Sequence, residues 1–169
     1  MNSPSQNSRP RLSWLHLLAL AGLFVLGVAV SFYLQPQRIP PLELTGLDGS
    51  KITLPADKPT WVNFWSITCP PCMKEMPVLN TLSREYQQQL AIVAIAIPYD
   101  APALVKEYQE QQQLTLPIAL DIDGKAMRTF TDNLVVPSHY LLDSRGKVLM
   151  THLGELDEAT MRGLIEKHL

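Results

Sequence analysis

Two cysteines, Cys69 and Cys72, are the residues of this chain whose type and spacing point most directly to chemistry. Two residues separate them, a spacing that can close a small disulfide ring, bind a metal ion, or do both at different times. A β-prone run at 60–65 precedes the pair, and helical periodicity runs from Cys69 to residue 86, so the pair opens a helix. Free backbone N–H groups and the helix dipole at such a start stabilise a thiolate, the attacking species in disulfide exchange. We therefore predict that Cys69 is the nucleophile and that Cys72, one turn into the helix, resolves the mixed disulfide.

Other uses of the pair are open from the residues alone. A static disulfide is one, although a loop this small removes little entropy from the unfolded chain. Zinc needs four ligands, and the sequence has no second cysteine pair. Thiolates suit Cu(I), and His139 is a candidate third ligand, so a copper-handling protein is the alternative from another functional class. We predict redox chemistry with no cofactor and no resident metal.

The sequence around the cysteines resembles the thioredoxin superfamily. Residues 63–77 are similar to the active-site strand and helix of that family, with Trp65 four residues before the first cysteine and the helix-kinking Pro77 five residues after the second. Residues 136–138 resemble its cis-proline loop. The resemblance covers roughly residues 39–169 and implies an α/β, thioredoxin-like domain that exchanges thiols and disulfides.

Glu75 lies three residues after Cys72, and this spacing, with an N-terminal hairpin and anchor, resembles the TlpA-like branch of the superfamily. That branch includes the membrane-tethered reductases of cytochrome c maturation, although residues 132–138 lack the glycine-rich approach of their loop, and Ser138 stands where those reductases carry an acidic residue just after the cis-proline. The resemblance implies that Glu75 relays a proton to or from Cys72; a solvated acid on the helix surface is the alternative. Asn63 stands where thioredoxins proper carry a buried aspartate.

The resemblance also implies residues that bind substrate. Pro137 is expected to be cis, and Val136 would then offer backbone groups to an extended substrate peptide by strand addition. Thr68 replaces the tryptophan that usually precedes the first cysteine, so it is expected to alter the partner surface. Trp65 is expected either to contact substrate or to lie in the core. For His139, which follows on the next strand, a place on a strand face is favoured over a ligand role.

The remaining pattern alternates strands and helices, which is typical of an α/β domain with a central mixed sheet flanked by helices. Strands are predicted at 42–45, 51–54, 60–65, 90–97, 116–120, 138–142 and 147–152, and helices at 69–86, 102–113, 125–130 and 157–168. The first two strands form a hairpin around the turn at 46–50. The uninterrupted apolar run at 90–97 indicates a central parallel strand covered on both faces.

Residues 12–34 carry no formal charge and are long enough to cross a bilayer core of about 30 Å. The preceding tail, 1–11, contains Arg9 and Arg11, so we expect it in the cytoplasm and the domain outside. The alternatives are a cleaved signal peptide ending near the small residues 29–31, and a buried core helix. We expect a linker at 35–41 and the folded domain at 42–169.

Composition limits the partners. The chain is 46% hydrophobic and 18% charged, as expected of a folded protein. From residue 39 onward it carries 11 basic and 16 acidic side chains, a net charge of −5 that argues against nucleic acid. We expect a reductase at the inner membrane that faces the periplasm, draws electrons from a membrane thiol donor of DsbD type, and reduces disulfides in exported proteins, apocytochrome c among them.

Three other functions stay open at this stage. An oxidase or isomerase has the same fold, because sequence does not set the direction of electron flow. A peroxiredoxin-type peroxidase ranks last, since Ser66 is suitably placed but Val62 stands where its motif needs proline. A tethered binding module without activity is the third.

Overall fold

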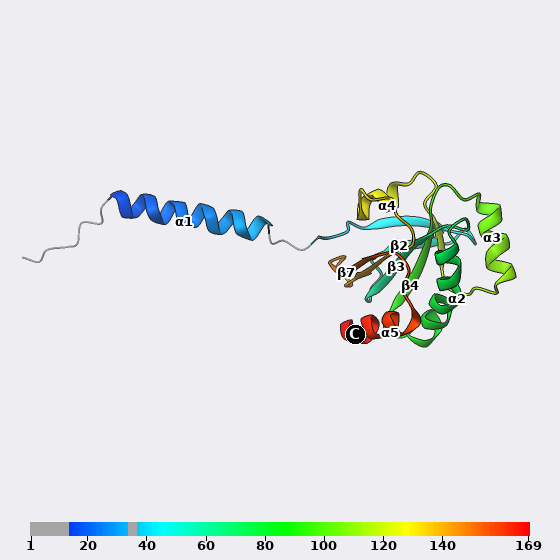
Figure 1. The fold of residues 1–169 in the computed structure, drawn as a ribbon. Helices are drawn as coiled ribbons and strands as arrows, with labels where there is room; N and C mark the ends of the chain where they lie inside the picture. Colours follow the sequence, from blue (N-terminus) through cyan, green and yellow to red (C-terminus); the bar gives the residue numbers. More distant parts are fainter. Residues whose placement is uncertain (1–13, 34–36) are drawn as a thin grey trace, which may run out of the picture. The chain divides into compact units, whose positions relative to one another are not determined.

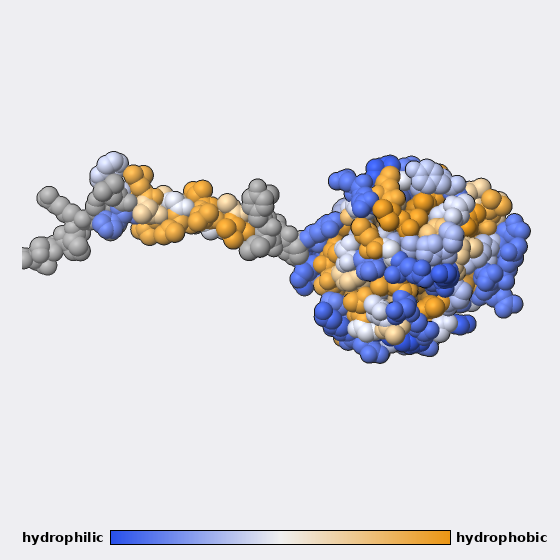
Figure 2. All heavy atoms as spheres, viewed as in Figure 1, coloured by the Kyte–Doolittle hydropathy of each residue, from blue (hydrophilic) through white to orange (hydrophobic). Residues whose placement is uncertain are grey.

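The computed structural model describes residues 14–33 and 37–169, which belong to two separate units. The first contains one helix, α1 (Trp14–Tyr33). Apolar side chains dominate the face of this helix that Figure 2 shows. The exposed ones include Trp14, Leu17, Leu18, Leu20, Leu23, Phe24, Val25, Leu26, Val28 and Val30. Within the described residues, no helix was found that is long and apolar enough to cross a membrane. The predicted tail at 1–11, both ends of the predicted span and the start of the predicted linker lie outside the described residues.

The second unit is built on one seven-stranded mixed sheet, in the order β2-β1-β5-β4-β3-β6-β7 (Figure 1). The strands are β1 (Leu42–Gly46), β2 (Lys51–Leu54), β3 (Thr60–Trp65), β4 (Ala91–Ala96), β5 (Ile118–Leu120), β6 (Ser138–Leu142) and β7 (Val148–Leu153). β3, β4 and β5 run parallel, and the outer pairs are antiparallel. The predicted hairpin, the central parallel strand and the mixed sheet are therefore confirmed, with ends that differ by up to two residues.

Helices cover both faces of this sheet. They are α2 (Pro70–Glu85), α3 (Pro102–Gln111), α4 (Lys125–Phe130) and α5 (Glu158–His168). One hydrophobic cluster joins the sheet to α2, α3 and α5, and a second joins the opposite face to α4 (Figure 1). Every residue of β3 is buried, because this strand lies between both clusters. The C-terminal end of β3 leads directly into the cysteine segment, so a fully buried strand positions the site.

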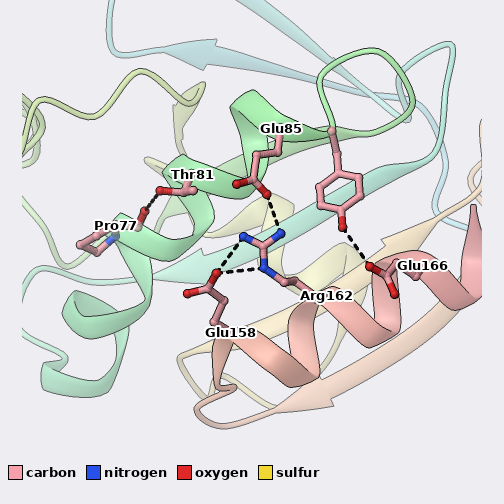
Figure 3. Close-up of polar contacts among 7 residues, drawn as sticks. Pro77, Thr81, Glu85, Glu158, Arg162 and Glu166 are labelled. Carbon is pink, nitrogen blue, oxygen red and sulfur yellow. Dashed lines mark hydrogen bonds and ion pairs between the residues drawn. The ribbon is translucent and has the colours of Figure 1, made fainter.

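A polar contact fastens α5 to α2 at the surface (Figure 3). The guanidinium of Arg162 donates to Glu85 at 2.5 Å and to Glu158, one turn earlier on α5, at 2.7 Å and 2.9 Å. These two carboxylates raise the pKa of Arg162. The hydroxyl of Tyr86, the C-cap of α2, lies 3.4 Å from the carboxylate of Glu166 on α5. These contacts join the C-terminal end of α2 to α5.

The domain begins earlier than the sequence predicted. Ile39 is 2% exposed, and its N–H donates to the carbonyl of Gly146 at 2.8 Å. The carbonyl of Gln37 accepts from the N–H of Val148 at 2.9 Å. Gly146 has a positive φ of 79°, and a Cβ there would collide with the Ile39 carbonyl oxygen. The predicted linker at 35–41 is therefore wrong for residues 37–41. Three prolines within 35–41 indicated a spacer, but the buried side chain of Ile39 is part of the core.

Candidate active site

Cys69 and Cys72 are joined by a disulfide at the start of α2, with their Cα atoms 5.3 Å apart. Cys69 is the N-cap of the helix, and its Sγ accepts from the backbone N–H of Cys72 at 3.3 Å. Pro70 and Pro71 occupy the first helical positions, where missing N–H groups cost nothing. Cys72 is 1% exposed, whereas Cys69 is only partly buried. The predicted difference in accessibility is confirmed, and a reagent in solvent can reach Cys69 first.

A buried carboxylate holds the loop before Cys69. Asp100, which follows β4 and is 6% exposed, accepts from the hydroxyl of Ser66 at 2.9 Å and from the backbone N–H of Ile67 at 2.9 Å. The Ser66 oxygen also accepts from the N–H of Thr68 at 3.1 Å. Sequence reasoning missed Asp100; the one signal was an acidic residue just after a central parallel strand. Ser66 is therefore buried and hydrogen-bonded within this loop.

The loop before β6 lies against the first cysteine. The Val136–Pro137 peptide bond is cis, as expected. The carbonyl oxygen of Val136 lies 3.7 Å from the Sγ of Cys69. The carbonyl of Pro137 accepts from the N–H of Gly154 at 2.8 Å, which fastens this loop to the end of β7. The structure therefore brings together three of the predicted site residues, Cys69, Val136 and Pro137.

Glu75 is buried under the cysteines and is not a surface acid. It is 2% exposed, and one carboxylate oxygen, Oε1, accepts from the backbone N–H of Leu156. The other, Oε2, lies 3.4 Å from Nε2 of His139 on β6. His139 is fully buried, and its Nδ1 is 3.2 Å from the side-chain nitrogen of Asn63 on β3. The solvated alternative for Glu75 is therefore wrong, because three elements enclose its carboxylate.

Trp65 lies beneath the site rather than on its surface. Its side chain is fully buried and its ring centroid is 5.5 Å from that of Tyr108 on α3. The Tyr108 hydroxyl donates to the carbonyl of Met73 at 3.4 Å, and burial raises the pKa of this phenol. Of the two expectations for Trp65, the core placement is the one observed, so direct contact with substrate does not fit. Thr68, by contrast, is exposed beside Cys69.

His139, the candidate copper ligand, contacts side chains other than those of the cysteines. His139 is contacted by Asn63 and Glu75 on two sides of its ring. Across residues 14–33 and 37–169, the structure contains no group of three or more His, Cys, Asp or Glu side chains that could hold a metal ion. The three-ligand copper site with His139 therefore has no geometric support.

Comparison with known proteins agrees with this arrangement. The profile of the AhpC/TSA family matches residues 36–150. "Thiol-disulfide oxidoreductase ResA" of Bacillus cereus is 30% identical over 160 residues, which cover 89% of this chain and 91% of that protein. "Thiol-disulfide oxidoreductase YkuV" of Bacillus subtilis is 36% identical over 121 residues, which cover 66% of this chain and 81% of that protein.

The crystal structure of StoA from Bacillus subtilis is similar in fold, with a TM-score of 0.69 and 22% identity over 77% of this chain and 99% of that one. The "Solution Structure of a Putative Thioredoxin from Neisseria meningitidis" gives a TM-score of 0.70 with 26% identity, over 79% and 90% of the two chains. The fold is therefore thioredoxin-like, as the sequence resemblance implied. The chain belongs to the AhpC/TSA family, and within it to the TlpA-like thiol–disulfide oxidoreductases.

Proposed function

We propose that this chain is a disulfide reductase of the bacterial cell envelope. It receives electrons from a membrane thiol donor of DsbD type and passes them to disulfides in exported proteins, with apocytochrome c as one substrate class. The observation that carries the proposal is the one-sided accessibility of the pair: Cys69 is partly exposed at a helix N-cap, and Cys72 is buried directly behind it. The names of the relatives, thiol–disulfide oxidoreductases, support the reaction class.

The chemistry follows from this difference. In the reduced protein the Cys69 thiolate attacks a substrate disulfide, forms a Cys69–substrate disulfide and releases one substrate thiolate. Cys72 then loses its proton, and its thiolate attacks the Sγ of Cys69. The Cys69–Cys72 disulfide forms, and the second substrate thiolate leaves. Two electrons have passed from the cysteines to the substrate, and one proton has passed from Cys72 to solvent.

The surface around Cys69 supports a protein substrate. Val136 presents its carbonyl beside the reactive sulfur, and main-chain groups can pair with an extended peptide whatever its sequence. Pro137 follows Val136 through the cis bond of this loop. Thr68 is the exposed residue that directly precedes Cys69 and is the side chain proposed to meet the partner.

The envelope location rests on the N-terminal segment. α1 is 20 residues long, contains no charged residue and is apolar around its circumference. This pattern suits a helix surrounded by lipid. The uncharged run at 12–34 extends beyond this helix at both ends, and Arg9 and Arg11 precede it. We propose that it anchors the chain in the inner membrane with the domain in the periplasm. Resistance of the protein to alkaline carbonate extraction, and activity of alkaline phosphatase fused after Leu169, test this.

The decisive experiment for the function is the reduction potential of the Cys69/Cys72 couple, measured against glutathione and dithiothreitol buffers. A reductase should lie near the thioredoxin value of about −270 mV, whereas an oxidase should approach about −120 mV. Insulin-disulfide reduction by the full chain in detergent, with the Cys69→Ser variant as control, measures activity in parallel. An oxidising potential would favour the oxidase, and no reaction with any disulfide would favour a tethered binding module.

A further inference from the structure

A buried titratable pair lies behind the cysteines. Glu75 on α2 and His139 on β6 are 2% and 0% exposed, and their Oε2 and Nε2 atoms lie 3.4 Å apart. Neither atom has a hydrogen-bond partner in the described residues, although each lies within ion-pair distance of the other. A buried carboxylate beside a histidine costs desolvation free energy that an apolar pair of the same volume would avoid. Stability alone therefore does not account for this pair.

The neighbours of the pair define where its proton resides. The amide nitrogen of Asn63 can only donate, and it faces Nδ1 of His139 at 3.2 Å. Nδ1 therefore accepts, and the proton of the neutral imidazole sits on Nε2, the nitrogen that faces Glu75. Glu75 Oε1 is occupied by the N–H of Leu156, which leaves Oε2 free to exchange a proton. Asn63 thus sets the tautomer that points the imidazole at the carboxylate.

Cys72 completes the arrangement. It precedes Glu75 by three residues on α2, and residues so spaced share a helix face. Both are among the buried residues of the helix. The thiol that must lose a proton during resolution is therefore one helical turn from the Glu75–His139 pair, in a region that solvent does not reach.

We propose that His139 takes part in proton transfer at Cys72: together with Glu75 it accepts the Cys72 proton when the mixed disulfide is resolved. This inference rests on the proposed function and assigns a task to a residue outside the cysteine motif. As the Cys72 sulfur attacks Cys69, its proton passes to the carboxylate–imidazole pair, which changes from a net charge of −1 to neutral. The substrate thiolate leaves with the electron pair of the broken S–S bond, and the pair then releases its proton to solvent.

The groups around the pair are consistent with this route. From β7, His152 faces His139 across the strand pair, with 6.1 Å between ring centroids, and it is partly exposed. From β3, Asn63 and Trp61 contribute neutral side chains; the Trp61 ring centroid is 5.7 Å from that of His139. Cys72 is the titratable group on the α2 side. His152 is therefore the partly exposed side chain beside the buried pair on the β7 side.

The test separates capture from resolution. The reduced full chain in detergent is mixed with an aromatic disulfide whose thiol product is coloured, and release is followed by stopped flow. The first equivalent reports attack by Cys69, and the second reports attack by Cys72 on the mixed disulfide. For His139→Gln we expect the second phase to slow about 10-fold or more and to change its pH dependence between about pH 5 and 9, with the first phase within about twofold of the parent.

Two comparisons make the result specific. His168→Gln is the same substitution at the end of α5, outside the site, and both of its phases should overlay those of the parent. If Glu75 and His139 act as one unit, the double variant Glu75→Gln/His139→Gln should be no slower in the second phase than the slower single variant. If the slowing of the second phase in the double variant equals the product of the two single effects, Glu75 and His139 contribute independently, and the proposal is overturned.

A second measurement needs no variant and holds even if a glutamine in the core prevents folding. The ring ¹⁵N signals of His139 in the parent should change between the disulfide and dithiol forms and titrate differently in each. Signals that are the same in both forms, or a second phase within twofold of the parent for His139→Gln, would overturn the proposal. Absence of the first phase in the parent would instead contradict the proposed function, so the two failures are distinguishable.

Discussion

The carbonyl oxygen of Val136 lies 3.7 Å from the Sγ of Cys69, although 67 positions separate the two residues in the sequence. The contact places a backbone acceptor beside the exposed sulfur and leaves Cys72 enclosed behind it. A substrate peptide that pairs with the Val136 backbone would bring its own sulfur to Cys69. The positions of the α2 N-terminus and the Val136 loop therefore favour attack at Cys69 first and resolution by Cys72 second.

Alkylation of the reduced protein should modify Cys69 before Cys72. Cys69 is partly exposed at the N-terminus of α2, where backbone N–H groups stabilise its thiolate, whereas Cys72 is 1% exposed. Mass spectrometry after a short iodoacetamide pulse at mildly acidic pH measures the order. Labelling that begins at Cys72 would reverse the assigned roles.

Cys72→Ser should trap partner proteins as mixed disulfides, and Cys69→Ser should not. Cys69 captures the substrate sulfur, and without Cys72 nothing in the site resolves the bond. Non-reducing gels of each variant expressed in cells of the parent strain, compared before and after dithiothreitol, show the adducts. Equal trapping by the two serine variants would contradict this division of labour.

Asp100→Ala should destabilise the fold by about 2–4 kcal/mol, because it leaves the Ser66 hydroxyl and the Ile67 N–H without their acceptor. Asp100→Asn keeps an acceptor oxygen and should cost less. Urea unfolding, monitored by fluorescence, gives both values. As a control, Asp132→Ala replaces an exposed aspartate and should stay within about 0.5 kcal/mol of the parent. An equally small change for Asp100→Ala would show that the loop before Cys69 does not depend on Asp100 for its stability.

Ile39→Ala should lower the free energy of unfolding by about 2–4 kcal/mol, since the side chain is 2% exposed and its removal leaves a cavity. The matched control is Ile122→Ala, at a position 63% exposed, where the change should be small. Chemical denaturation of the two variants side by side measures the difference. If both behave alike, residues 37–41 are a linker after all.

The stability contributed by Asp157 should depend on pH. Its carboxylate caps α5 by accepting from the Thr160 N–H at 2.7 Å, and this bond lowers the pKa of Asp157 below its ordinary value of 3.8. A lowered pKa in the folded state means that the stabilisation is present above the unfolded value and is lost as pH falls through the folded one. Asp157→Ala should therefore be destabilising at neutral pH and become indistinguishable from the parent at strongly acidic pH.

The control for this effect is Asp157→Asn, since asparagine is an equally good N-cap but does not titrate in this range. Its stability relative to the alanine variant should not vary with pH. Thermal unfolding from about pH 2 to 7 measures all three proteins. A parent–alanine difference that persists unchanged at the acidic end would show that the carboxylate charge is not the cause.

The residues themselves determined much of this protein, because those features depend on local order along the chain. Alternation and apolar runs predicted the strands, and Asp157 marked the start of α5, since periodicity and capping are properties of neighbouring residues. The spacing of Cys69 and Cys72 at a helix start predicted which sulfur is accessible.

Only the tertiary structure decided what each side chain faces. Glu75 carries a charged side chain of a type usually found at the surface, yet β6 and the segment before α5 enclose its carboxylate. Ile39 stands among prolines, yet it fills the core against Gly146. These contacts join residues more than 60 positions apart, and their free energy depends on packing between elements. No pattern along the chain encodes that distance, so the fold, and not the motif, places His139 beside Glu75.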